Sequence, residues 1–226
     1  MKIIEGGVTA AKGFEAAATA AGIKYQGRTD MAIIYSEKPC KVAGTFTTNV
    51  VKAAPVKWDR QIVESKQKSQ AVIVNSGIAN ACTGEEGMKY CEETAKEAGK
   101  VLGIDEKGVL VGSTGVIGMQ IPIDKIKAGI TELAKEKKAD LASGTEAAKA
   151  IMTTDTKKKE VAVTFMAGDT EVTIANAVLL NGYSEGDTIH EGEMFAQTTN
   201  TNVNFHIEID TDGYGWDYID PRLVLY

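Results

Sequence analysis

Residues 71–84 read Ala71-Val72-Ile73-Val74-Asn75-Ser76-Gly77-Ile78-Ala79-Asn80-Ala81-Cys82-Thr83-Gly84. The first four residues are apolar and mostly β-branched, which is typical of a buried strand. The small and polar residues that follow predict a loop where that strand ends. A helix should come next, because Thr83 and Glu86 have the spacing of a capping box and apolar residues recur at helical intervals up to Leu102. Gly103 is placed to end that helix.

The same order of strand and loop recurs further along the chain. Residues 109–111 are an apolar run, and they lead into Gly112-Ser113-Thr114-Gly115-Val116-Ile117-Gly118. Helices are expected at about 124–137 and from Ser143, which forms a second capping box with Glu146. Further strands are expected at 31–35 and 42–47, and a hairpin at 161–165 and 171–174. Strands in neighbouring pairs with helices between them predict an α/β or α+β fold with a mixed sheet.

Composition excludes several classes of protein. A hydrophobic fraction of 43% and a charged fraction of 25% over 226 residues are ordinary for a soluble globular chain. A net charge of -6 argues against nucleic acid as the main partner, and no apolar run approaches the ~20 residues of a membrane span. Three cysteines suit reduced thiols in the cytoplasm, and they are too sparse to suggest a metal site. We therefore expect a cytoplasmic protein with no metal, membrane or nucleic-acid partner.

The composition changes near residue 176. Every lysine lies at or before Lys159, and after residue 175 the only basic residue besides His190 and His206 is Arg222. Residues 203–209 alternate apolar and polar side chains, which is typical of a strand with one face in water. The sequence thus predicts two parts, residues 1–175 and a divergent, acidic, β-rich tail at 176–226 whose role is unknown.

Three polar clusters could carry chemistry. In the first, Asn75, Ser76 and Asn80 precede a helix N-terminus, where an anion would be stabilised. The alternative is a connection in which these side chains only satisfy their own backbone. The second cluster offers the Thr114 hydroxyl and an unhindered Gly115 amide, a pair suited to holding an oxyanion.

The third cluster is Thr153-Thr154-Asp155-Thr156. Its hydroxyls could bind the amino or carboxylate group of a substrate, or could cap a helix. Other candidates are weaker: neither histidine has a serine or cysteine motif beside it, and Asp210-Thr211-Asp212-Gly213 lacks the later ligands of a calcium loop. Cys82 stands near a helix start, where packing and thiolate chemistry are both conceivable.

In this order, the three clusters resemble the ornithine acetyltransferases, also called glutamate N-acetyltransferases or the bifunctional ArgJ family. The similarity rests on Val74–Gly77 with Ala79–Gly84, on Ser113–Gly118 and on Ile151–Thr156. It is supported by Gly7–Phe14 and by the segments 43–49 and 51–56. The resemblance covers roughly residues 5–175 and implies a fold like that of the ArgJ and DmpA proteins.

The resemblance implies a specific reaction. Enzymes of this family move an acetyl group from N-acetylornithine to glutamate, some also take it from acetyl-CoA, and no other cofactor is implied. Their precursor cuts itself at an Ala-Thr bond into an α chain and a β chain, and the freed threonine is the nucleophile with its own amine as base. By the match, Thr114 and Gly115 form the oxyanion hole and Thr153 or Thr154 contacts the substrate. Implied partners are acetylornithine, glutamate, a β chain and further copies in a homo-oligomer.

The chain also departs from the family pattern. Ile78 stands where the family commonly has Asn, and Lys157-Lys158 replaces a frequent Phe-Pro. The family's Lys-Gly-Ser-Gly-Met segment and its Asn-Met-Ala-Thr-Met-Leu cleavage site are both missing, and the only Ala-Thr bond is Ala18-Thr19 in an unrelated context. We therefore expect an α-chain-like region that is inactive alone because it lacks the nucleophile. The alternative is a non-catalytic binding or regulatory protein on the same scaffold.

Overall fold

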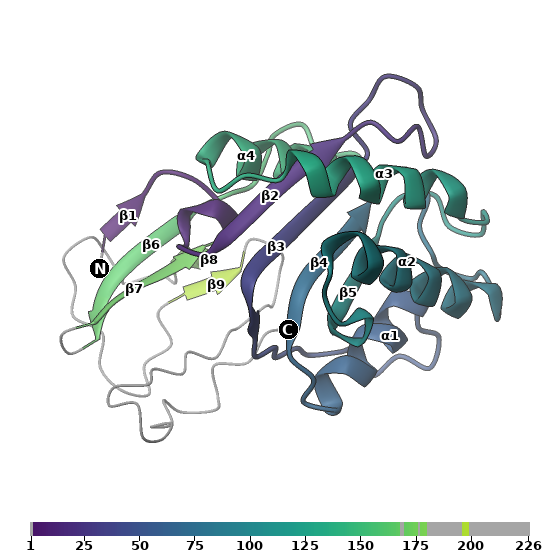
Figure 1. The fold of residues 1–226 in the computed structure, drawn as a ribbon, viewed down its shortest axis with the longest axis horizontal. Helices are drawn as coiled ribbons and strands as arrows, with labels where there is room; N and C mark the ends of the chain where they lie inside the picture. The colour runs from purple at the N-terminus through teal and green to yellow at the C-terminus, as the bar shows by residue number, and fades with distance from the viewer. Residues whose placement is uncertain (1, 168–169, 176, 180–195, 199–226) are drawn as a thin grey trace.

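The computed structural model describes residues 2–167, 170–175, 177–179 and 196–198 (Figure 1). Its main sheet has the strand order β2-β3-β4-β5. The bounds of these strands are Phe14–Thr19, Met31–Cys40, Ser69–Asn75 and Val109–Ser113. The first three strands pair antiparallel, whereas β4 and β5 run parallel. The predicted α+β class with a mixed sheet is therefore confirmed.

Two helices cover one face of this sheet. The helix α2 (Glu86–Leu102) connects the parallel strands β4 and β5, and α3 (Ile123–Glu136) packs beside it (Figure 1). Gly103 ends α2 as predicted, in a left-handed conformation with φ of 69°, where its amide donates to the carbonyl of Gly99. The buried core between these helices and the sheet includes Met31, Ile33, Ile73, Ala98, Val109, Ile130 and Leu133.

The opposite face of β2 and β3 is covered by α4 (Leu141–Ala150). Side chains alternate across a strand, so Ala17 faces the main core while Ala16 packs against Ala147 and Ala150. These residues are all small, which lets the helix approach the sheet closely. The carboxyl end of α4 is thereby held near the ends of the central strands.

A second sheet has the order β1-β6-β7, with bounds Lys2–Ile4, Ala162–Ala167 and Thr170–Ala175. The antiparallel pairing of β6 and β7 confirms the predicted hairpin.

The remaining described elements are short. The 3-10 helices η1 and η2 span Val8–Ala10 and Glu106–Gly108, and β8 (Ala177–Leu179) pairs with β9 (Ala196–Thr198). The predicted strand at 203–209 and the segment Asp210–Gly213 lie outside the described residues. None of the described helices is long and apolar enough to cross a membrane.

The helix α1 (Ala54–Glu64), which sequence periodicity did not reveal, covers the outer edge of β5. The Trp58 indole Nε1 donates to the carbonyl of Val109 at 2.9 Å, and the amide of Val111 donates to Oδ1 of Asp59 at 3.0 Å. Side chains of α1 thus satisfy backbone groups that an edge strand would otherwise leave unpaired.

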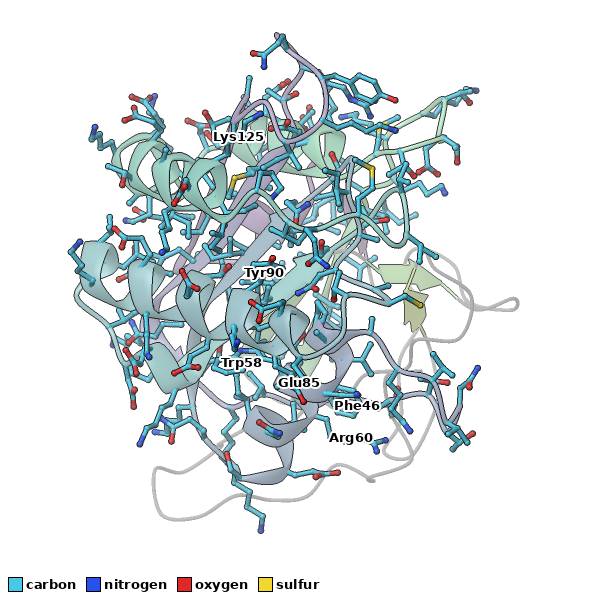
Figure 2. All side chains as sticks on the ribbon, turned by 90° about the vertical axis from the view of Figure 1, so that its right-hand side faces the viewer. Phe46, Trp58, Arg60, Glu85, Tyr90 and Lys125 are labelled. Carbon is cyan, nitrogen blue, oxygen red and sulfur yellow. The ribbon has the colours of Figure 1, made fainter. Side chains whose placement is uncertain are left out.

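The predicted strand at 42–47 is wrong. Residues 41–49 form an irregular segment, and β3 extends to Cys40 instead. The segment packs on the helix α1 instead, where a Cβ placed on Gly44 would lie 3.5 Å from Cγ2 of Val63. Its Phe46 ring lies 5.3 Å from the guanidinium carbon of Arg60, a contact visible in Figure 2.

Both predicted capping boxes are also wrong. The helix α2 begins only at Glu86 with no side-chain cap, and the Thr83 hydroxyl donates instead to Oδ1 of Asn80 at 2.7 Å. The helix α4 begins at Leu141, two residues before Ser143, and its cap is Asp140, whose Oδ1 accepts from the amide of Ser143 at 2.7 Å. In both cases a residue three positions earlier in the chain, Asn80 or Asp140, takes the bond that the expected partner, Glu86 or Glu146, would have made.

Candidate functional site

The loops that follow β4 and β5 lie side by side. Parallel strands end at the same edge of a sheet, so the loop at 75–84 and the loop at 113–118 leave it together. Four backbone hydrogen bonds join them: Thr114 N to Asn75 O, Val116 N to Gly77 O, Ala79 N to Val116 O and Gly118 N to Ala81 O, at 2.9–3.2 Å. The structure thus brings together the first two of the three predicted clusters.

Glycine is required at residue 115 by this pairing. Gly115 has a φ of +131°, a conformation that L side chains rarely adopt. A Cβ placed on it would lie 2.3 Å from the carbonyl carbon of Gly77 and 2.7 Å from the amide nitrogen of Ile78. The two loops therefore touch backbone to backbone at this point.

The polar side chains of the first loop point inward and are buried. Asn75 Nδ2 donates to the carbonyl of Ile78 at 2.9 Å, and Asn80 Nδ2 donates to the carbonyl of Gly87 at 2.9 Å. The Ser76 hydroxyl donates to the carbonyl of Ala150, the last residue of α4, at 2.6 Å. These bonds fix the loop to itself, to α2 and to α4, and leave these three side chains little freedom to meet a ligand directly.

Ser113 has a part in the site that the sequence did not suggest. Its Oγ accepts from the amide of Asn80 at 2.9 Å and donates to the carbonyl of Ile78 at 3.0 Å. One hydroxyl therefore fastens the last residue of β5 to the middle of the neighbouring loop. The sequence offered one signal for this role, a serine immediately before Thr114. It could not show the partner of that serine, because the loop that Ser113 binds lies 33 residues earlier in the chain.

Two hydrogen-bond donors of the second loop are available to a ligand. Thr114 is half-buried and Gly115 is exposed. Within the described part of the chain, neither the Thr114 hydroxyl nor the Gly115 amide has a hydrogen-bond partner, although the amides on both sides do. A hydroxyl and an adjacent amide held on a fixed loop can bind one oxygen atom that carries negative charge.

The third cluster follows α4. Thr153 and Thr154 are exposed, and no hydrogen bond joins either of them to the other clusters within the described ranges. Asp155 pairs with Lys159 at 2.6 Å, and this hydrogen bond and ion pair lower the pKa of Asp155. The segment is anchored upstream, since Ser76 binds Ala150 and the Arg28 guanidinium donates to the carbonyl of Met152.

Two titratable side chains stand on the helices that pack against β5: Asp59 on α1 is half-buried and Cys91 on α2 is buried. Burial raises the pKa of Asp59 to about 7, against the lowering effect of the Val111 amide. Burial, together with the nearby Asp59 carboxyl, raises the pKa of the Cys91 thiol to about 12. Cys91 is therefore a neutral packing residue and not a nucleophile. Cys82 is exposed at the end of the loop.

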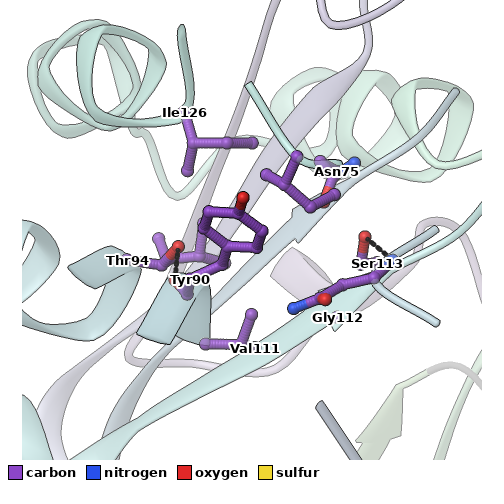
Figure 3. Close-up of a pocket in the computed structure, with 10 residues that line it drawn as sticks. Asn75, Tyr90, Thr94, Val111, Gly112, Ser113 and Ile126 are labelled. Atoms are coloured by element: carbon purple, nitrogen blue, oxygen red, sulfur yellow. Dashed lines mark hydrogen bonds between the residues drawn. The ribbon is translucent and has the colours of Figure 1, made fainter. Parts of the chain in front are cut away.

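Two cavities border the loops. A small one of about 10 Å³, enough for one water molecule, is lined by Asn75, Tyr90, Gly112 and Ser113 (Figure 3). A wider one of about 430 Å³ opens where the first loop meets α2, beside Lys52, Lys57 and Cys82. Among the described residues, no cluster of three His, Cys, Asp or Glu side chains could hold a metal ion.

Comparisons with known proteins show which family the chain is similar to. The model of the ArgJ family matches residues 15–179. The arginine biosynthesis bifunctional protein ArgJ of Gloeobacter violaceus is 46% identical over 208 residues, which are 92% of this chain and 49% of that protein. The ArgJ protein of Thermotoga neapolitana is 49% identical over 66% of this chain and 36% of its own length. The chain thus spans about half the length of the curated relatives it matches, or less.

Two solved structures share the fold. The crystal structure of ArgJ from Bacillus halodurans has a TM-score of 0.72 and 38% identity, covering 76% of this chain and 90% of that chain. The ornithine acetyltransferase of Mycobacterium tuberculosis, solved in complex with ornithine, has a TM-score of 0.68 and 44% identity. That match covers 71% of this chain and 86% of the other.

Proposed function

The chain belongs to the ArgJ family, and from this membership we propose that residues 1–175 supply the oxyanion-holding half of an acetyltransferase site. The reaction is the transfer of an acetyl group from N-acetylornithine to glutamate. The observation that carries the proposal is the pair of unpartnered donors at Thr114 and Gly115, held on a loop that four backbone hydrogen bonds fix in place.

In the proposed mechanism a nucleophile attacks the acetyl carbonyl carbon, and the carbonyl oxygen gains negative charge. The Thr114 hydroxyl and the Gly115 amide donate to this oxygen and stabilise the tetrahedral intermediate. Collapse of the intermediate breaks the C–N bond and expels ornithine, whose nitrogen takes up the proton that the nucleophile lost, and leaves an acetylated nucleophile. The amino group of glutamate then attacks the acetyl carbon, the bond to the nucleophile breaks, and the proton lost by that amine returns to the nucleophile as acetylglutamate leaves. Thr153 or Thr154 is proposed to contact the amino-acid part of the substrate.

The nucleophile is proposed to come from outside residues 1–175. The family's threonine follows an Ala-Thr cleavage site, and the only Ala-Thr bond here is Ala18-Thr19. That bond lies inside β2, where Ala18 pairs with Ala32 and Thr19 with Met31. A peptide bond held in the ladder of the main sheet is poorly placed for self-cleavage, which supports a threonine supplied by a β chain.

The test is complementation. The chain should give no acetylglutamate from acetylornithine and glutamate when it is alone, and should give it when mixed with the C-terminal half of the Thermotoga neapolitana relative. In that mixture, Thr114→Ala should lower kcat by about 10²–10³-fold with KM little changed, because its hydroxyl acts on the transition state. The matched control is Thr131→Ala, whose hydroxyl donates to the carbonyl of Lys127 one turn earlier on α3.

Three results would count against the proposal. Turnover by the chain alone would show that the nucleophile lies within it. Equal activity of Thr114→Ala and Thr131→Ala would show that the Thr114 hydroxyl does not stabilise the oxyanion. Tight binding of the complementary half without any turnover would favour the alternative, a binding or regulatory protein. Acetyl-CoA as donor and assembly into a homo-oligomer are proposed on the family's pattern, and the same mixture tests both.

The proposed compartment is the cytoplasm. The cysteines Cys40, Cys82 and Cys91 are all free, which suits reducing surroundings. The reaction needs only amino-acid substrates that a cytoplasmic pathway would supply.

A further inference from the structure

The peptide that joins Thr114 to Gly115 lies between two hydrogen bonds to the first loop. The Thr114 amide donates to the carbonyl of Asn75 at 3.0 Å, and the Val116 amide donates to that of Gly77 at 3.1 Å. The Gly115 amide between them has no partner among the residues that the structure describes. Its direction is therefore set by the backbone on either side of it and by what that backbone touches.

What Gly115 touches is one peptide of the first loop, Gly77–Ile78. The space beside its Cα is filled by the backbone of that peptide, which a Cβ on Gly115 would meet at 2.3–2.7 Å. No side chain lies between the two backbones, so a displacement of Ile78 is passed directly to Gly115. The groups that hold Ile78 in place therefore also decide where the Gly115 amide points.

Two side chains hold the carbonyl of Ile78. It accepts from Nδ2 of Asn75 at 2.9 Å and from Oγ of Ser113 at 3.0 Å. The bond from Asn75 ties the first loop to its own beginning, whereas Ser113 is the last residue of β5 and immediately precedes Thr114. Ser113 Oγ also accepts from the amide of Asn80 at 2.9 Å. Ser113 thus connects the first loop, at two points, to the strand that carries both proposed donors.

The far end of this connection is held by α2. Nδ2 of Asn80 donates to the carbonyl of Gly87 at 2.9 Å and to Sγ of Cys91 at 3.4 Å, and Oδ1 of Asn80 accepts from the Thr83 hydroxyl at 2.7 Å. These four residues are buried, so water does not readily replace a bond that is lost among them. The Ser113 hydroxyl therefore fixes the second loop to a frame that is itself anchored on a helix.

We propose that Ser113 is a positioning residue for acetyl transfer, which holds the loops so that the Thr114 hydroxyl and the Gly115 amide converge on one oxygen atom. This inference rests on the proposed function, because convergence matters only if that oxygen gains charge. The proton of the Ser113 hydroxyl is taken by Ile78, so Ser113 acts through the two donors. Its effect should appear in kcat, since displaced donors weaken binding of the transition state more than binding of the substrate.

The kinetic test uses the full chain mixed with the C-terminal half of the Thermotoga neapolitana relative. Ser113→Ala should lower kcat by about tenfold with KM changed by less than about twofold, and Ser113→Thr, which keeps the hydroxyl, should recover most of kcat. The matched control is Ser65→Ala at the end of α1. The Ser65 hydroxyl also accepts from an amide, that of Gln67 at 3.3 Å, and donates to a carbonyl, that of Ile62 at 2.8 Å. Its loss should leave kcat unchanged.

A double variant separates positioning from general stability. If Ser113 acts through the donors, the fall in kcat caused by Ser113→Ala should be smaller when Thr114→Ala has already removed one of them. A general loss of folded protein would lower kcat by the same factor in both backgrounds.

Hydrogen exchange of the chain alone tests the geometry without any turnover. Ser113→Ala should speed exchange of the Ala79 and Val116 amides, which join the two loops, and leave the amides of α3 unchanged. Should Ser113→Ala fail to fold, Ser113→Cys keeps a side chain of similar size with a weaker donor and should change kcat and exchange in the same direction but less.

The outcomes distinguish this inference from the proposed function. Equal kcat of Ser113→Ala and Ser65→Ala, an equal fall in both backgrounds, or unchanged exchange of the Ala79 and Val116 amides would overturn the positioning role and leave acetyl transfer supported. No turnover by the unaltered mixture would instead contradict acetyl transfer. The exchange of the two loop amides would then decide by itself whether Ser113 holds the donors in place.

Discussion

At the scale of single residues, Gly115 determines whether the two loops can pair. Gly115→Ala places a Cβ against the backbone of Gly77 at a positive φ, and should destabilise the chain by about 3 kcal/mol in urea unfolding. The control is Gly118→Ala, which also has a positive φ (85°) but meets nothing within 4 Å and should cost only about 1 kcal/mol. Similar losses in both variants would show that conformational strain, and not contact between the loops, makes glycine necessary.

Asp59 should make stability depend on pH. Its pKa is raised from 3.8 to about 7 in the folded chain, so between these values the folded state holds a proton that the unfolded state has released. The contribution of Asp59 therefore falls as pH rises from about 4 to 7, at a limiting slope of about 1.4 kcal/mol per pH unit, and is constant above that range.

Asp59→Asn should remove this dependence while its carbonyl oxygen still accepts from the Val111 amide. The measurement is the difference in unfolding free energy between the variant and the unaltered chain at pH 5 and at pH 8, with the variant relatively more stable at pH 8. A difference that stays constant across this range would contradict the raised pKa.

At the scale of secondary structure, the start of α4 depends more on Asp140 than on Ser143. Asp140→Ala removes the acceptor for both the amide and the hydroxyl of Ser143 and should lower the urea midpoint. Ser143→Ala keeps the amide bond and loses only the contact of the hydroxyl with the Asp140 carboxylate, so it should lower the midpoint by less. The Ser143 amide lowers the pKa of Asp140, so the cap acts above the ordinary carboxyl pKa and is lost as pH falls through the folded value. A loss of stability in Ser143→Ala but not in Asp140→Ala would show that the predicted capping box of Ser143 and Glu146 starts the helix after all.

Substitution of Trp58 tests how much the packing of α1 on the edge of β5 contributes to stability. Trp58→Phe keeps an aromatic ring but removes the indole donor to Val109, and should cost about 1–3 kcal/mol because that carbonyl stays partly buried. Lys57→Ala, an exposed change on the same helix, should be near neutral. Hydrogen exchange of the β5 amides should be faster in Trp58→Phe only; equal protection in both variants would show that α1 does not hold that edge.

Elements with a strong local pattern were predictable from the sequence, and elements that depend on distant partners were not. The apolar runs at 71–74 and 109–111 and the Gly103 stop were correct because their signals lie within a few residues. The alanine-rich β2 and the helix α1 were missed because β2 gains its stability from α4 and β3, and α1 from the edge of β5. The same limit applies to the site, where Ser113 acts through Ile78 and Asn80, far away in sequence.

At the scale of the whole molecule, the N-terminal strand β1 pairs with β6, about 160 residues later (Figure 1). Deletion of residues 1–5 should therefore speed hydrogen exchange of the amides at 162–164 and leave those of β4 unaffected, since the two sheets are separate ladders. Lys2→Ala, which keeps the backbone of β1, is the control. Equal loss of protection in β4 would show that both sheets unfold as one cooperative unit.

The contact between Gly115 and Gly77 has a consequence for mutational scanning. One of the two proposed donors belongs to the main chain, so only proline among the replacements deletes it. Every replacement at Gly115 displaces the loop, proline included, because none of them fits the positive φ and the contact with Gly77. A scan of all substitutions would therefore score residue 115 as a folding position and overlook its chemistry. Replacing the amide that precedes Gly115 with an ester, by chemical ligation, removes the N–H and leaves the glycine in place. Backbone editing is thus the method suited to this half of the site.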